Sequence, residues 1–192
     1  MSYNDTNFNN KTILITGGAG FIGSNIAFYF QQNFPNSNIV IFDCFRSESI
    51  FSNGNLQSFG HYKNLIGFKG RIICGNINNS THLNFLSDYK FDYIFHQAAI
   101  SDTRVDDQTI VMETNVNSFY NLLKIAKKNQ ATMIYASSAA TYGSMPSPQT
   151  EGHEGPENPY GFSKLMMDQI ANKYSKDNPE LTIVGLRYFN VY

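Results

Sequence analysis

Three glycines near the start of the chain constrain its fold more than any other feature of the sequence. Gly17, Gly20 and Gly23 follow the apolar run Thr12–Thr16 and open a segment with an apolar residue at every fourth position. In such a strand–turn–helix unit the first glycine permits the tight turn, the second lets the backbone approach a pyrophosphate, and the third lets helix and strand pack closely. The spacing therefore predicts a dinucleotide-binding turn at the positive end of a helix.

Short apolar runs alternate with longer amphipathic ones along the rest of the chain, which predicts an α/β fold with a Rossmann-type doubly wound parallel sheet of about six strands. Ile22, Ile26 and Phe30 are predicted to form the buried stripe of the helix after the first strand. The predicted strands are Thr12–Thr16, Ile39–Phe42, Arg71–Cys74, Tyr93–His96, Met133–Ser137 and Thr182–Leu186.

Two further helices and two loops complete the predicted order. One helix covers about Val111 to Lys128, and another begins at Asn158-Pro159, an N-cap residue followed by proline at the first helical position. Residues 47–67 and 144–157 lack a periodic pattern and are predicted to be loops. We expect one domain over residues 1–192, with no separate substrate lobe in this chain.

Composition excludes several classes of function. The formal charge of −1 gives no footprint for nucleic acid or an anionic membrane, and no apolar stretch reaches membrane-spanning length. The polar first residues lack a signal core, which favours a cytoplasmic protein. Cys44 and Cys74 are expected to be buried free thiols. The histidines lack metal-ligand spacing, so no metal site is expected.

Asp43 ends the second predicted strand about 20 residues beyond the last glycine. A carboxylate there can accept hydrogen bonds from the adenosine ribose, which favours NAD. Arg46 stands three residues later, where a guanidinium could neutralise a 2′-phosphate and favour NADP, although a solvated loop residue is an equally good interpretation. The residues alone leave NAD and NADP both open.

Tyr160 and Lys164 stand four residues apart at the start of the last predicted helix, so that their side chains share a face. An ammonium beside a phenol lowers the pKa of the phenol, which would make Tyr160 a general acid and base. Most pairs with this spacing lie on surface helices, but a dinucleotide turn upstream favours catalysis. Ser138 ends the preceding strand and could bind a substrate oxygen or merely cap backbone groups. His96 is interpreted as a hydrogen-bonded core histidine.

Four passages together resemble the extended short-chain dehydrogenase/reductases, which act on nucleotide-linked sugars. They are residues 17–23, His96-Gln97-Ala98-Ala99, the Tyr160–Lys164 pair and residues 187–192. Residues 135–143 and 185–192 are similar to the branch that epimerises ADP-heptose for the lipopolysaccharide core. This resemblance implies an internal redox cycle. Hydride passes from C-6″ of the sugar to the cofactor while Tyr160 takes the hydroxyl proton, and hydride then returns to the other face of the transient aldehyde.

The resemblance also implies roles for individual residues. Lys164 would orient the cofactor and tune Tyr160, Ser138 would hold the reacting oxygen, and Asn190 would reach the substrate, which is ADP-heptose or a similar nucleotide sugar. The cofactor would be NADP, as is usual in this branch, with NAD possible. Beyond the glycines, the implied cofactor contacts are Phe21 and Ile22 at the pyrophosphate, Asp43 and Cys44 at the ribose, and Gln97, Ala98, Ala99, Ile100, Ser101, Asn115 and Val191 along the cleft.

Departures from the family pattern leave alternatives open. Asn76 stands where many relatives have an acid, and a family lysine that follows the Phe-Asn-Val-Tyr run has no counterpart before the chain ends at Tyr192. We therefore expect a truncated epimerase with weak or no activity. The alternatives are another nucleotide-sugar 4-epimerase or dehydratase, or a non-catalytic NAD(P)-binding module. Relatives are commonly oligomers, so a homo-oligomer is possible.

Overall fold

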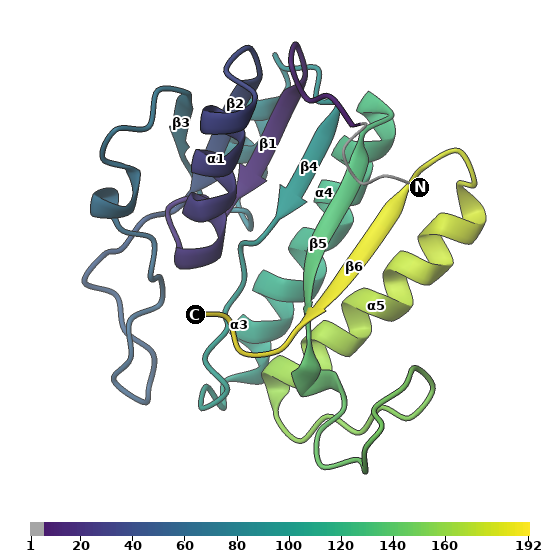
Figure 1. Cartoon of the computed structure of the whole chain (residues 1–192). Coiled ribbons are helices and arrows are strands. Elements are labelled where there is room, and N and C mark those ends of the chain that lie inside the picture. Colours follow the sequence, from purple (N-terminus) through teal and green to yellow (C-terminus); the bar gives the residue numbers. More distant parts are fainter. Residues whose placement is uncertain (1–5) are drawn as a thin grey trace.

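The computed structural model describes residues 6–192, which form one sheet of six parallel strands with helices on both faces (Figure 1). The strand order β3-β2-β1-β4-β5-β6 is that of a dinucleotide-binding doubly wound sheet. The predicted fold class is confirmed, and each predicted strand is present with bounds within two residues. The strands are β1 Thr12–Thr16, β2 Asn38–Asp43, β3 Arg71–Cys74, β4 Tyr93–His96, β5 Thr132–Ser138 and β6 Ile183–Tyr188.

Helices cover the two faces of this sheet unequally. α1 (Phe21–Asn33) packs on one face over β1 and β2, whereas α4 (Ser118–Asn129) and α5 (Pro159–Asp177) pack on the other (Figure 1). On β6, Val184 and Leu186 point away from α5 and are about 40% exposed. The shorter helices are α2 Ser80–Leu83, α3 Gln108–Met112, the 3-10 turns η1 Tyr62–Leu65, η2 Asn84–Leu86 and η4 Ala139–Thr141, and the π-helical turn η3 Glu113–Asn117.

The predicted buried stripe of α1 is only partly correct. Phe30 is buried, but Ile22 and Ile26 are half-buried, whereas Gly23 and Ala27 are buried. The small residues Gly23 and Ala27 occupy buried positions of α1, and Ile26 packs at the margin of the same core cluster. The periodic pattern of apolar residues did not predict the buried positions Gly23 and Ala27, because glycine and alanine contribute little to such a pattern.

The other helix and loop predictions are largely confirmed. The helix predicted over 111–128 is present, but it begins earlier at α3 and contains the π-helical turn η3. Asn158 caps α5 as predicted, since its side-chain oxygen accepts a hydrogen bond from Gly161 N at 2.8 Å. Residues 144–157 form a loop without helix or strand, whereas the loop predicted over 47–67 contains η1 and a bridge between Ile50 and Leu56.

Candidate active site

A cleft of about 880 Å³ lies at the carboxyl ends of the parallel strands. The loops after β1, β2, β4 and β5 line it together with the first turn of α5 and the residues that follow β6. This is the place at which doubly wound sheets bind their ligands, because the strand order reverses between β1 and β4. Both sequence motifs, the glycine turn and the Tyr160–Lys164 pair, therefore face one cavity.

The glycine turn leaves no room for side chains. Gly17 has φ +69°, and a Cβ atom there would lie 2.6 Å from Ala98 N in the loop after β4. A Cβ atom on Gly23 would lie 2.3 Å from Gly17 O, so α1 begins directly against the turn. The N–H groups of Phe21 and Ile22 open this helix, where backbone donors have no intrahelical acceptor. The turn thus presents backbone N–H groups at the positive end of a helix, a cradle that favours a bound anion.

Asp43 joins this cradle to the end of β2. Its Oδ2 accepts a hydrogen bond from Ala19 N at 2.9 Å, and its Oδ1 accepts one from Phe45 N at 2.7 Å. Burial raises the pKa of Asp43, and the two backbone hydrogen bonds oppose this rise. Gly60 packs directly on the carboxylate, since a Cβ atom there would lie 2.3 Å from Oδ1. Asp43 therefore lines the cleft as predicted and also fixes three loops in place.

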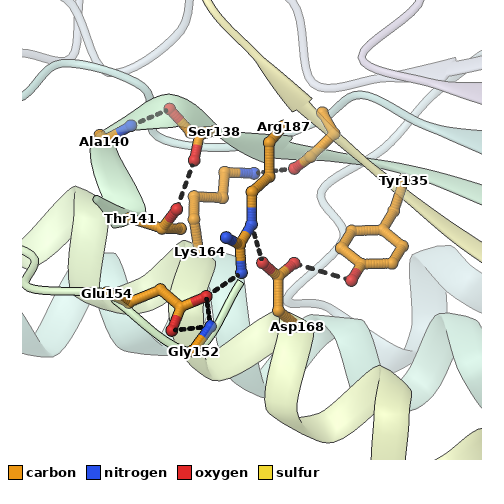
Figure 2. Close-up of polar contacts among 10 residues, drawn as sticks. Tyr135, Ser138, Ala140, Thr141, Gly152, Glu154, Lys164, Asp168 and Arg187 are labelled. Atoms are coloured by element: carbon orange, nitrogen blue, oxygen red, sulfur yellow. Dashed lines mark hydrogen bonds and ion pairs between the residues drawn. The ribbon is translucent and has the colours of Figure 1, made fainter. Parts of the chain in front are cut away.

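Tyr160 and Lys164 occupy the opposite end of the cleft, on the first two turns of α5. Lys164 is buried, and its Nζ donates a hydrogen bond to Ala136 O on β5 at 2.8 Å (Figure 2). Nζ also lies 5.8 Å from the centroid of the Tyr160 ring. The shared helix face that the sequence predicts is confirmed, and the lysine is directed at the sheet backbone.

The sequence-based expectation for the phenol is not met in this structure. The pKa of Tyr160 is raised, because burial disfavours the phenolate, and the Ser138 hydroxyl opposes this rise. The Lys164 ammonium is itself buried and donates its hydrogen bond to Ala136 O on β5. Burial lowers the pKa of Lys164 to about 8.

Ser138 lies at the junction of β5 and η4, beside this pair. Its hydroxyl accepts a hydrogen bond from Ala140 N at 3.1 Å, and Thr141 Oγ1 donates one to its carbonyl at 2.8 Å (Figure 2). The capping interpretation and the substrate-binding interpretation are compatible, because a hydroxyl that accepts one bond can still donate its proton. Ser138 also lines the cleft.

Most predicted site residues line this one cleft. They are Gly17, Gly20, Phe21, Ile22, Gly23, Asp43, Cys44, Gln97, Ala98, Ala99, Ile100, Ser101, Ser138, Tyr160, Lys164, Asn190 and Val191. Arg46 and Asn115 are not among the lining residues. Arg46 is exposed on the loop after β2, and only its backbone is bonded, with N donating to Gly60 O at 2.6 Å.

Asn115 lies fully buried behind the cleft wall, in the π-helical turn η3. Its Nδ2 donates to Ile100 O and to Ser163 Oγ, both at 2.9 Å, and its Oδ1 accepts from Ile100 N at 2.9 Å. These bonds connect the loop after β4 to α5. Asn115 thus positions the wall and the Tyr160 helix instead of contacting the cleft itself.

Two predictions about single residues need correction. His96 is buried as predicted, and its Nδ1 lies 2.7 Å from Thr16 Oγ1, but its Nε2 has no partner among residues 6–192. Burial lowers the pKa of His96 to about 3, so the ring is neutral. Cys44 and Cys74 are free thiols as predicted but are exposed, because both stand at strand ends that open into the cleft.

Two groups of residues around the cleft were not predicted from the sequence. The loop after β2 reaches across to the loop after β4, where Phe51 packs against Ile100 and Val105 and Asn55 donates to Asp102. No periodic pattern marks such a loop contact. The second group is the cluster of Tyr135, Glu154, Asp168 and Arg187 beneath Lys164 (Figure 2). Asp168 could have been found, since it stands four residues after Lys164 on the same helix face.

Over the part of the chain that the structure describes, no three histidine, cysteine or acidic side chains gather as a metal site would require. None of the helices within residues 6–192 has the length and apolar character needed to cross a membrane.

The known proteins to which this chain is similar include several sugar-nucleotide epimerases. A curated ADP-L-glycero-D-manno-heptose-6-epimerase from Brachyspira hyodysenteriae is 37% identical over 185 residues, which are 94% of this chain and 54% of that protein. The crystal structure of the Helicobacter pylori enzyme of the same name is 51% identical with a TM-score of 0.89, and the match covers 100% of this chain and 59% of that one. A UDP-Glc/GlcNAc 4-epimerase from Campylobacter jejuni is 27% identical with a TM-score of 0.79, over 94% of this chain and 54% of that one.

The chain therefore spans a little over half the length of these relatives. The family model described as the NAD dependent epimerase/dehydratase family matches residues 13–192, nearly the whole described chain. The family resemblance seen in the sequence is thus confirmed: this chain belongs to the NAD dependent epimerase/dehydratase family.

Proposed function

We propose that this chain forms the cofactor-binding domain of an enzyme that inverts C-6″ of ADP-D-glycero-D-manno-heptose. The observation that supports this most directly is the single cleft, which brings the glycine cradle and the Ser138, Tyr160 and Lys164 side chains together. The heptose epimerase from Helicobacter pylori, at 51% identity, supports the choice of substrate.

The cofactor we propose is NADP. Gly17 and Gly23 form a cradle that a Cβ atom would fill, and the first N–H groups of α1 would hold the pyrophosphate. Both Asp43 oxygens already accept backbone hydrogen bonds, which reduces their capacity for a ribose diol. Arg46 is exposed three residues further on, and no carboxylate within residues 6–192 pairs with it, so its guanidinium is available for a 2′-phosphate.

The bound nicotinamide would supply a hydride acceptor that afterwards acts as the hydride donor. Tyr160 would accept the C-6″ hydroxyl proton and later return it, while Ser138 would hold the reacting oxygen by a hydrogen bond. Lys164, fixed to β5 through Ala136 O, would hold its positive charge beneath the phenol and the cofactor ribose. Asn190, which lines the cleft after β6, would contact the substrate.

The acidic residues of the cleft favour epimerisation over dehydration. Elimination needs an acid beside the reacting carbon, yet η4 carries Ala139 and Ala140 next to Ser138. The acidic residues that line the cleft are Asp43, which is held by backbone amides, and Asp102, which pairs with Arg104 at 3.0 Å. Neither stands on the elements that carry Ser138 or Tyr160.

The test combines cofactor titration with proton NMR of C-6″ in the presence of NADP and ADP-D-glycero-D-manno-heptose. Tyr160→Phe should lower the rate of inversion by about 100- to 10,000-fold, because it removes the general acid and base. Its Kd for NADP should stay within about twofold of the original, since the glycine cradle is untouched. Tyr120→Phe, at an exposed tyrosine of α4, is the matched control and should change neither quantity.

Three results would contradict the proposal. Absence of NADP binding would remove the cofactor assignment, and full activity of Tyr160→Phe would remove the role of the phenol. Inversion by this chain at a rate typical of complete enzymes would contradict the expectation that the domain alone is weakly active. A non-catalytic module would bind NADP and be indifferent to Tyr160→Phe in every assay.

A further inference from the structure

A cluster of charged and polar side chains lies directly beneath Lys164, outside the cleft. Asp168 follows Lys164 by one turn of α5 and is buried. Its Oδ1 accepts a hydrogen bond from Tyr135 Oη on β5 at 2.8 Å, and its Oδ2 accepts one from Arg187 Nε on β6 at 2.9 Å (Figure 2). One carboxylate therefore ties the catalytic helix to two strands.

Arg187 extends the cluster to the loop before α5. Its second terminal nitrogen donates to Glu154 Oε1 at 2.7 Å, and its guanidinium lies 4.7 Å from the centroid of the Tyr142 ring. A guanidinium held by two carboxylates and an aromatic face has little freedom to move. Arg187 consequently fixes where the Asp168 carboxylate can lie.

The cluster is balanced in charge only when Lys164 is included. The cations Lys164 and Arg187 stand against the carboxylates Asp168 and Glu154. Lys164 donates its hydrogen bond to a neutral carbonyl, which cannot compensate a buried charge. The Asp168 carboxylate raises the pKa of Lys164 against the larger lowering by burial.

The other titratable groups around Lys164 carry no charge that could replace Asp168. His96 on β4 is neutral, with its pKa lowered to about 3 by burial and by Lys164 itself. Burial raises the pKa values of Tyr160 on α5 and Tyr135 on β5, so both phenols are protonated. Glu154 is bound on the far side of Arg187.

We propose that Asp168 is a positioning residue, whose carboxylate is the counter-charge that keeps Lys164 an ammonium beneath Tyr160 and that Arg187 shares with Lys164. This proposal rests on the proposed function for its catalytic meaning, but the electrostatic relation holds whatever the substrate. It predicts opposite effects for the two partners. Loss of Asp168 removes the counter-charge, whereas loss of Arg187 removes a competing cation and leaves the carboxylate to Lys164.

The test is an NMR titration of the Lys164 side chain in the whole chain, labelled with ¹³C at lysine Cε. The Lys164 signal is assigned by its disappearance in Lys164→Arg. In Asp168→Asn the titration midpoint should fall by about one pH unit, because a nearby opposite charge is lost. In Arg187→Gln the midpoint should rise. Glu154→Gln removes the same charge on the far side of Arg187 and should move the midpoint by less than a third as much.

A merely structural role for the cluster would lower stability in these variants without moving the midpoint in opposite directions. Circular dichroism establishes which variants fold, and the midpoint is read only in those. An unchanged midpoint in either Asp168→Asn or Arg187→Gln, whichever folds, overturns the proposal. The titration needs neither cofactor nor substrate, so its outcome is separate from that of the C-6″ inversion assay.

Discussion

A buried aspartate lies at the glycine-turn end of the cleft and another lies beneath the Tyr160–Lys164 end, but the two are stabilised by different means. Asp43 accepts hydrogen bonds from the backbone N–H groups of Ala19 and Phe45. Asp168 is held by the Tyr135 phenol and the Arg187 guanidinium. Backbone amides offset burial only in part, so the pKa of Asp43 is raised. The end near Asp43 thus consists of closely packed backbone with no room for further side-chain atoms. The end near Asp168 depends on opposite side-chain charges that compensate one another.

The largest loss of stability should follow from removal of Arg187, the cation that Asp168 and Glu154 share. Arg187→Met leaves Asp168 and Glu154 without their shared cation, and this should lower the free energy of unfolding by about 3 kcal/mol. Lys11→Met is the matched control, because the Lys11–Asp92 pair lies at the surface and should contribute less than about 1 kcal/mol. Urea unfolding of both variants measures the difference. Equal losses would show that burial does not distinguish the two ion pairs.

A side chain added in the glycine turn should cost less stability than loss of Arg187 but should weaken NADP binding more. Gly23→Ala places a Cβ atom 2.3 Å from Gly17 O, and the resulting shift of α1 should reduce stability by about 2 kcal/mol. NADP affinity should fall at least tenfold, since the displaced N–H groups form the pyrophosphate cradle.

Gly67→Ala provides the control for backbone strain. Gly67 also has a positive φ, but no atom lies within 4 Å of its would-be Cβ. This substitution should reduce stability by about 1 kcal/mol and leave the Kd for NADP unchanged. If both alanine variants bind NADP equally well, the glycine turn is not the cofactor cradle.

The contrast between local backbone features and long-range side-chain contacts explains what could be predicted from the sequence. The glycine turn, Asp43 and the strands are local features, since residues 12–43 contain the strand, turn, helix and acid of one unit. The Tyr160–Lys164 pair is likewise local to one helix. The hydrogen bonds of the Asp168 cluster join positions up to 33 residues apart, as in the Tyr135–Asp168 bond, and such contacts exist only once the chain has folded. The direction of the Tyr160 pKa was wrong for the same reason, because burial is a tertiary property.

The smallest effect concerns the pH dependence of stability at Asp43. An acid with a raised pKa binds its proton more tightly in the folded state, so stability falls as pH rises from the ordinary pKa of 3.8 to the raised value. Asp43→Asn lacks this titration. The difference in unfolding free energy, Asp43 protein minus variant, should therefore decrease across this window and level off above it.

Asp92→Asn provides a comparison for this test, because the Asp92 carboxylate accepts a backbone hydrogen bond and also pairs with a cation. Its Oδ2 accepts from Thr12 N, its Oδ1 lies 3.1 Å from Lys11 Nζ, and its pKa is lowered. An acid with a lowered pKa stabilises the folded state above pH 3.8, and this contribution disappears as pH falls through the lowered value. The difference in unfolding free energy, original protein minus variant, should thus fall with pH for Asp43→Asn and rise with pH for Asp92→Asn, as measured by urea unfolding between about pH 2.5 and 6. A positive slope for Asp43 as well would mean that its backbone amides more than offset burial, so that its pKa would be lowered and not raised.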